Sequence, residues 1–172
     1  MKILLALLAL SAMAFGHTST LESGGFSSGF LHPISGLDHI LAMVGVGMVA
    51  YASAKNGYLL LVAFMGAMLI AATIGFAGVE FAYVEEGILL SIAAVFALIG
   101  FARKMSMAVI FFIIAFFGMF HGFAHGAEFQ SGSFLAYMAG FSTSTLLLHI
   151  SGIALAYIYA QTAMRKQTQL AK

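Results

Sequence analysis

The chain contains very few residues of the kinds that build soluble and disulfide-linked domains. Cysteine and tryptophan are absent from its 172 residues, and proline occurs once, as Pro33. Without cysteine there is no disulfide framework, thiolate metal site or cysteine nucleophile. Charged residues make up 8% of the chain, against about 25% in soluble domains, and the net charge of +1 leaves no basic footprint for a polyanion. These absences exclude a soluble enzyme, a disordered protein and a nucleic-acid binder.

The chain is rich in apolar residues. Hydrophobic residues account for 62% of it, and the mean hydropathy is +1.06. Each of five apolar segments is close in length to the roughly 20 residues that cross a bilayer as a helix. The segments lack the alternation of polar and apolar residues that is typical of β-barrel strands. They cover about residues 34–54, 58–78, 85–101, 105–125 and 134–161. The sequence therefore predicts an all-α fold, a polytopic membrane bundle of five transmembrane helices.

Residues 1–16 have the pattern of a signal peptide. Lys2 precedes an apolar run, and residues 14–16 form a small-x-small cleavage site. The run from residue 3 to 15 has 13 residues, fewer than the roughly 17–25 needed to span a membrane. We expect cleavage after Gly16, which makes His17 the mature amino terminus and residues 17–33 a polar exterior loop. An uncleaved first transmembrane helix is the alternative.

Basic and acidic residues fall in alternate connections between the expected helices. If the mature amino terminus lies outside, every Lys and Arg of the mature chain falls on the cytoplasmic side, as the positive-inside rule requires. These residues are Lys55, Arg103, Lys104, Arg165, Lys166 and Lys172. The acids Glu80, Glu85, Glu86 and Glu128 fall outside. We expect an N-out, C-in protein of the bacterial inner membrane, with residues 162–172 as a basic cytoplasmic tail.

The few ionisable residues within the expected spans are mostly histidines. Such residues are costly in lipid and usually face the interior of a bundle with a partner. Asp38 and His39 lie near the outer end of the first expected span, and His149 lies deep in the fifth. His121 and His125 are four residues apart near the outer end of the fourth, so they can share one helix face with the following Glu128.

His32 completes this outer group. Because Pro33 suits the first turn of a helix, we expect His32 at the mouth, in a cap-like position. His39 is seven residues further on, and Met43 lies one turn deeper on the face of His39. Imidazoles and carboxylates that converge at the same outer level of the membrane form a divalent-metal site that suits nickel, cobalt, zinc or copper. The predicted ligands are His32, Asp38, His39, His121, His125 and Glu128.

Several of these residues have a second interpretation. His149 is either a hydrogen-bonded packing residue or a second, deeper station for the ion, helped by the neighbouring hydroxyls of residues 143–145. His121 and His125 could cap a helix end, and Asp38 could orient His39 without binding the ion. His17 could add its imidazole and its free α-amine to the site if cleavage exposes it.

Two motifs resemble those of the HupE/UreJ family. Residues 32–39, HPISGLDH, resemble that family's H-P-x-x-G-x-D-H opening, and residues 120–128, FHGFAHGAE, resemble its F-H-G-x-A-H-G-x-E segment. Gln130 and Glu86 depart from the family pattern outside these motifs. The resemblance implies the functional set His32, Asp38, His39, His121, His125 and Glu128.

The resemblance also implies a permease for nickel or cobalt, associated with hydrogenase or urease maturation, rather than an enzyme. The expected partners of the protein are the lipid bilayer, the divalent ion, and maturation proteins or a second copy of the chain. No permanent cofactor is expected, and zinc or copper are alternative ions. Two rival functions use the same residues: an intramembrane zinc-dependent hydrolase, and a metal-binding accessory protein without transport. No nucleotide-binding motif is present to couple transport to ATP.

Overall fold

The computed structural model describes residues 24–53 and 55–170. Over these residues the chain forms helices and no strand, which confirms the all-α prediction for this part. The elements are α2 (Phe26–Ser35), α3 (Leu37–Ala52), α4 (Tyr58–Phe76), α5 (Val84–Phe101), η1 (Ala102–Lys104), α6 (Met107–Glu128) and α7 (Phe134–Leu170). Four helices are long and apolar enough to cross a membrane, or five if α2 and α3 together make one span. The expected signal peptide and His17 lie outside the described residues.

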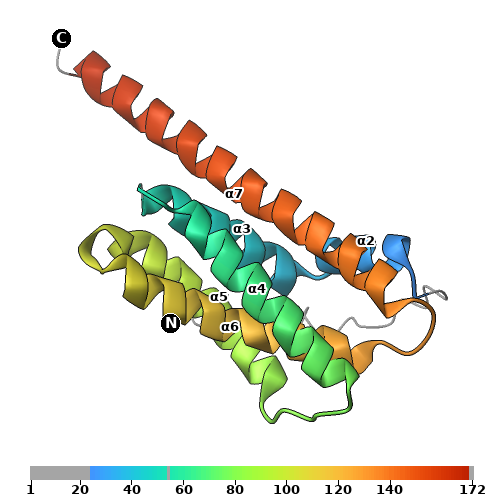
Figure 1. The fold of residues 1–172 in the computed structure, drawn as a ribbon. Helices are drawn as coiled ribbons and strands as arrows, with labels where there is room; N and C mark the ends of the chain where they lie inside the picture. The colour runs from blue at the N-terminus through green and yellow to red at the C-terminus, as the bar shows by residue number, and fades with distance from the viewer. Residues whose placement is uncertain (1–23, 54, 171–172) are drawn as a thin grey trace, which may run out of the picture.

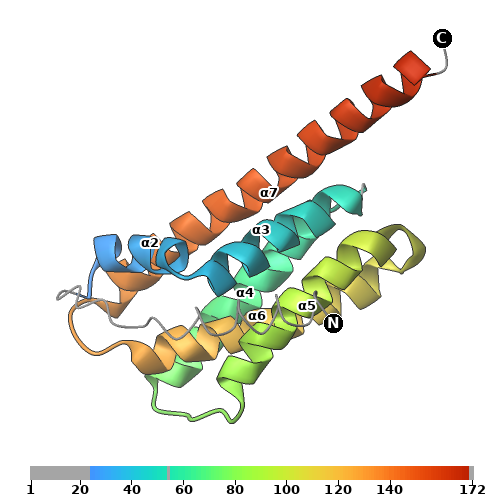
Figure 2. The same ribbon diagram turned by 180° about the vertical axis from the view of Figure 1, so that it is seen from behind.

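The helices run up and down through a bundle whose longest member is α7 (Figures 1 and 2). α4 packs along α6, α2 and α3 pack on α7, and α3 also contacts α5. The α3–α4 turn and η1 lie at one end, where Asn56, Arg103 and Ile153 line the same hollow. At the other end, the Ser133 amide donates to the Gly24 carbonyl at 2.7 Å and joins the start of α2 to the α6–α7 connection.

Charge is segregated between these two ends. Lys55, Arg103, Lys104, Arg165 and Lys166 lie in the α3–α4 turn, η1 and the end of α7, which we call the basic end. The acids Glu80, Glu85, Glu86 and Glu128 lie in the α4–α5 connection, the first turn of α5 and the last turn of α6, which we call the acidic end. The long apolar helices thus separate the cationic side chains from these four acids.

The structure differs from the sequence prediction at the first span. Instead of a loop to residue 33 and a helix from residue 34, the chain is helical from Phe26 and bends by 85° at Gly36, between α2 and α3. Pro33 lies near the end of α2 rather than in its first turn, and His32 is inside that helix rather than capping it. Proline has no amide to donate to the carbonyl four residues earlier, so the hydrogen-bond ladder of α2 is interrupted at Pro33, two residues before the helix ends.

A row of glycines holds α6 against α4. A Cβ atom added at Gly122 or Gly126 would lie 2.1 Å from a carbonyl oxygen of α4, that of Met68 or Ala72. The two backbones are therefore in direct contact, as at small-xxx-small interfaces in membranes. His121 and His125 each precede one of these glycines, so they point about 100° away around α6. The glycine row thus sets the direction of both imidazoles.

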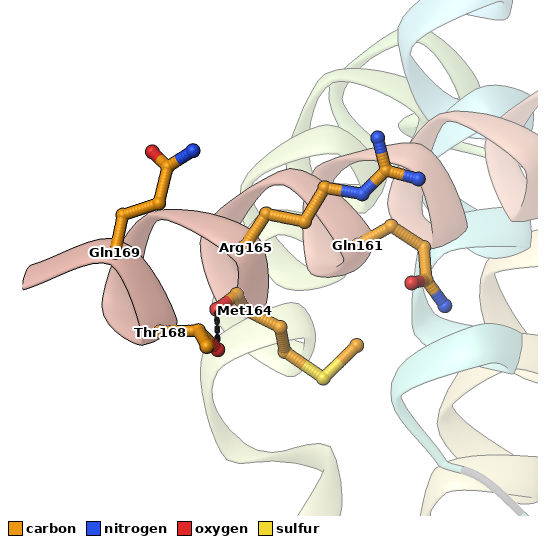
Figure 3. A pocket seen from close by; sticks show the side chains of 5 residues that line it. All are labelled: Gln161, Met164, Arg165, Thr168 and Gln169. Atoms are coloured by element: carbon orange, nitrogen blue, oxygen red, sulfur yellow. Dashed lines mark hydrogen bonds between the residues drawn. The ribbon is translucent and has the colours of Figure 1, made fainter. Parts of the chain in front are cut away.

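α7 continues well past the rest of the bundle at the basic end (Figure 1). Its 37 residues correspond to about 55 Å, compared with about 30 Å for the hydrocarbon core of a bilayer. Residues 162–170 of the expected tail are part of this unbroken helix. A shallow hollow here is lined only by α7 side chains, and Thr168 donates to the Met164 carbonyl at 3.0 Å (Figure 3). A hollow on one helix encloses nothing, and it is remote from the histidines.

Candidate metal centre

Three histidines from three different helices meet at the acidic end. One ring nitrogen from each of His32, His39 and His125 lies within 4.8 Å of the others, and we call this set the histidine triad. His39 and His125 are 2% and 1% exposed, whereas the side chain of His32 is 25% exposed. The triad therefore has one member open to the surroundings and two inside the bundle.

The ends of the helices favour a cation at the triad. His32 lies in the last turn of α2 and His125 in the last turn of α6, where the helix macrodipole is negative. His39 lies in the first turn of α3, whose positive dipole end is offset by the adjacent Asp38 carboxylate. Two partial negative charges and a carboxylate thus surround three nitrogen donors.

The two buried imidazoles of the triad are in direct contact. Nε2 of His39 lies 2.8 Å from Nε2 of His125, so one ring donates its proton to the other when the pair is metal-free. Nitrogens bound to one ion at about 2.0–2.1 Å are about 2.9 Å apart at a right angle and about 3.4 Å apart in a tetrahedron. The observed spacing is that of a hydrogen bond, so the two rings need to separate by only about 0.1–0.6 Å for both nitrogens to bind one ion.

Each buried imidazole has a carboxylate at its other nitrogen. Asp38 Oδ1 lies 3.0 Å from His39 Nδ1, and Glu128 Oε2 lies 3.6 Å from His125 Nδ1. Glu128 Oε2 is also 3.9 Å from His32 Nε2. A carboxylate behind a metal-binding imidazole fixes the ring and strengthens its donor nitrogen. This geometry favours the interpretation in which Asp38 orients His39, while Glu128 lies between two members of the triad.

His121 lies beside the triad rather than in it. Its ring centroid is 5.2 Å from that of His39, but its Nε2 lies 3.1 Å from the Ser91 hydroxyl. That hydroxyl donates its own proton to the Ile88 carbonyl at 2.6 Å, so it accepts from His121. Nε2 of His121 is thus a donor to α5. The spacing of Ser91 and His121 along the chain does not predict this contact between α5 and α6.

His149 and His121 contact the same aromatic ring. The centroid of Phe64 is 5.3 Å from that of His121 and 5.2 Å from that of His149. Another phenylalanine, Phe141, covers His125 at a centroid distance of 4.2 Å. Phe64 could not be singled out in advance, because the chain has 17 phenylalanines with no distinguishing spacing.

Comparison with known proteins agrees with the two histidine motifs. The family profile described as HupE / UreJ protein matches residues 5–171, nearly the whole chain. The chain belongs to the HupE/UreJ family. Protein HupE of Rhizobium leguminosarum bv. viciae is 38% identical over 156 residues, which cover 88% of this chain and 80% of that protein. No solved structure gives a significant match. The HupE/UreJ family is associated with nickel and cobalt uptake for hydrogenase and urease.

In this HupE/UreJ protein, Gly36 allows the bend and the triad to coexist. A Cβ atom at this position would lie 2.6 Å from Asp38 Oδ1 and 3.0 Å from His39 Nδ1. The residue has an extended backbone, with φ −102° and ψ 123°, that other amino acids can adopt. Glycine is therefore required here by the close approach of the carboxylate and the imidazole, not by its backbone angles.

We predict that Gly36→Ala weakens metal binding about tenfold, the lower range for losing the group that orients a metal ligand. The added methyl group pushes the Asp38 carboxylate away from His39, while the apolar helices are unchanged. Binding of nickel or cobalt to the purified protein measures the effect. Gly100→Ala on α5 is the matched control, since a Cβ atom there meets nothing within 4 Å. Equal affinities in the two variants would show that the Asp38–His39 contact does not support binding.

Proposed function

We propose that this HupE/UreJ protein is a permease that carries a divalent transition-metal cation, nickel or cobalt, across the inner membrane of a bacterium. The observation that carries the proposal is the convergence of His32, His39 and His125 within 4.8 Å. Three imidazoles with supporting carboxylates suit a borderline metal ion, and the association of the family with nickel and cobalt supports the choice of ion.

In the proposed orientation the acidic end faces the exterior and the basic end faces the cytoplasm. The positive-inside rule supports it, because the cationic residues of the described chain gather at the basic end. After removal of the signal peptide, α2 and α3 form a broken first span and α4 to α7 complete five. Broken membrane helices expose backbone groups beside a site, as they do in other transporters.

Loading starts at the exposed member of the triad. The acids of the acidic end raise the local concentration of cations. A hydrated ion first exchanges water for the accessible imidazole of His32, then for the facing nitrogens of His39 and His125. Glu128, with its side chain 43% exposed, offsets part of the ion's charge from the outer side. Release at the basic end delivers the ion to metalloenzyme-maturation proteins.

Uptake into liposomes that contain the purified protein tests this function. We predict that they accumulate nickel above protein-free liposomes, and that cobalt competes better than zinc or copper. Glu128→Gln should reduce the uptake rate about tenfold, since it removes the acid shared by His32 and His125. Glu86→Gln is the matched control: it removes the same charge from another exposed acid of the acidic end, but one outside the printed contacts of the triad, and should lower the rate much less.

The same assay separates the rival functions. Tight metal binding without uptake into the liposomes would contradict the permease and support a non-transporting accessory protein. Stoichiometric zinc together with cleavage of a peptide or lipid would support the intramembrane hydrolase, which needs an open metal position and a general base.

A further inference from the structure

Three polar side chains on α7 are completely buried and do not belong to the triad, and two of them, Thr145 and His149, have a polar atom without a hydrogen-bond partner among the described residues. Thr145 and His149 are both 0% exposed. They are four residues apart, so they lie one turn apart on the same face of the helix. Buried polar atoms inside a membrane bundle are costly unless they have a partner or a function.

The hydrogen bond of His149 determines which of its nitrogens is available. Nδ1 lies 2.7 Å from the backbone carbonyl of Met43 on α3. A carbonyl only accepts, so Nδ1 carries the proton and the neutral ring has its lone pair on Nε2. Nε2 is buried and makes no hydrogen bond to any residue that the structure describes. The ring is thus held with a free donor nitrogen, as metal-binding histidines are.

Like His149, Thr145 has a buried polar atom without a hydrogen-bond partner among the described residues, and on α7 it shares this property with the partly exposed Ser142. The hydroxyls of Thr143, Ser144 and Ser151 donate to carbonyls of their own helix, at 2.7, 3.2 and 2.7 Å. The Thr145 hydroxyl has no such bond within the described part of the chain, although it is buried. Its oxygen is therefore available to a ligand on the same face as His149.

Close backbone contact holds this part of α7 rigidly on α3. A Cβ atom at Gly47 would lie 2.0 Å from the His149 carbonyl oxygen, and one at Gly152 would lie 2.0 Å from the Val44 carbonyl oxygen. The two helices therefore touch at the level of His149. A donor on a rigid helix crossing is preorganised for binding.

We propose that His149 Nε2 and Thr145 Oγ1 form a second binding site for the transported cation, deeper in the bundle than the triad. The inference rests on the proposed permease function. The ion reaches this inner site past His121 and the ring of Phe64, which contacts both His121 and His149. Both donors are neutral, whereas the triad is supported by two carboxylates. The inner site therefore holds the ion more weakly and releases it toward the basic end.

The absence of cysteine makes a direct test possible. In His149→Cys, the introduced thiol is the only one in the protein, so a cobalt–thiolate charge-transfer absorption band reports metal bound at that position. We expect the band on adding Co²⁺ to the purified variant. Thr143→Cys, at an exposed position of the same helix, is the matched control and should show no band.

A second set of variants tests the site without a new ligand. His149→Phe should retain cobalt binding at the triad but lower the liposome uptake rate at least tenfold. Thr145→Val should slow uptake several-fold, and Thr143→Val should not. Retained triad binding shows that the variants are folded.

The outcomes separate this inference from the proposed function. If wild-type liposomes take up the ion, but His149→Phe matches their rate and His149→Cys shows no band, the inner site is refuted and the permease stands. The inner site is also refuted, and the permease stands, if the absorption band appears equally in Thr143→Cys. If the wild-type protein neither binds nor transports the ion, both proposals fail.

Discussion

His39→Ala is expected to abolish accumulation of nickel or cobalt by cells that depend on this protein. The substitution removes the imidazole whose Nε2 faces that of His125 at 2.8 Å and whose Nδ1 lies 3.0 Å from Asp38 Oδ1. Loss of a group behind a ligand lowers metal affinity about 10–100-fold, so loss of the ligand itself should exceed about 100-fold. His125→Ala should give the same result, because the two rings form one pair.

The measurement is uptake of radioactive nickel or cobalt, normalised to the amount of protein in the membrane. Thr73→Ala is a suitable control, since this exposed hydroxyl of α4 bonds only to its own helix, at the Leu69 carbonyl. It should accumulate the ion as the wild type does. Wild-type uptake in both histidine variants would refute the triad as the loading site.

Gly122→Leu is expected to eliminate correctly folded protein from the membrane. The position has no room for a Cβ atom, because the Met68 carbonyl oxygen of α4 would lie 2.1 Å from it. A leucine side chain therefore forces α6 away from α4 along their whole interface. Overpacking of a well-packed core typically costs about 1–3 kcal/mol, and here the obstacle is backbone that cannot change its rotamer.

Gly66→Leu provides the matched control for this prediction. Gly66 lies in α4, and a Cβ atom there meets nothing within 4 Å. We expect this variant to be extracted in detergent as a single species at the wild-type yield, and Gly122→Leu to be degraded or aggregated. Equal yields and equal elution volumes of the two variants would show that α4 and α6 do not pack through the glycine row.

The parts of the site that depend on one helix could be predicted from the sequence. His121, His125 and Glu128 share α6, and the spacing of four and three residues is enough to place them at one end of that helix. The segregation of charge between the two ends also followed from the order of apolar segments. Membership of the HupE/UreJ family, suggested by two short motifs, is confirmed over nearly the whole chain.

The parts that depend on packing between helices could not be predicted. His32 reaches His39 because the chain bends by 85° at Gly36, whereas a continuous helical pattern was expected there. The glycines and serines before Pro33 concealed a helix that gains its stability by packing on α7. Met43 was predicted to lie one turn deeper on the face of His39, yet its backbone carbonyl is what contacts His149.

X-ray absorption spectroscopy of the purified, nickel-loaded protein tests the central claim most directly. The account predicts an ion bound by imidazoles of His32, His39 and His125, and a spectrum that loses one imidazole in each of the three single alanine variants. Spectra and nickel content identical to the wild type in all three variants would contradict it.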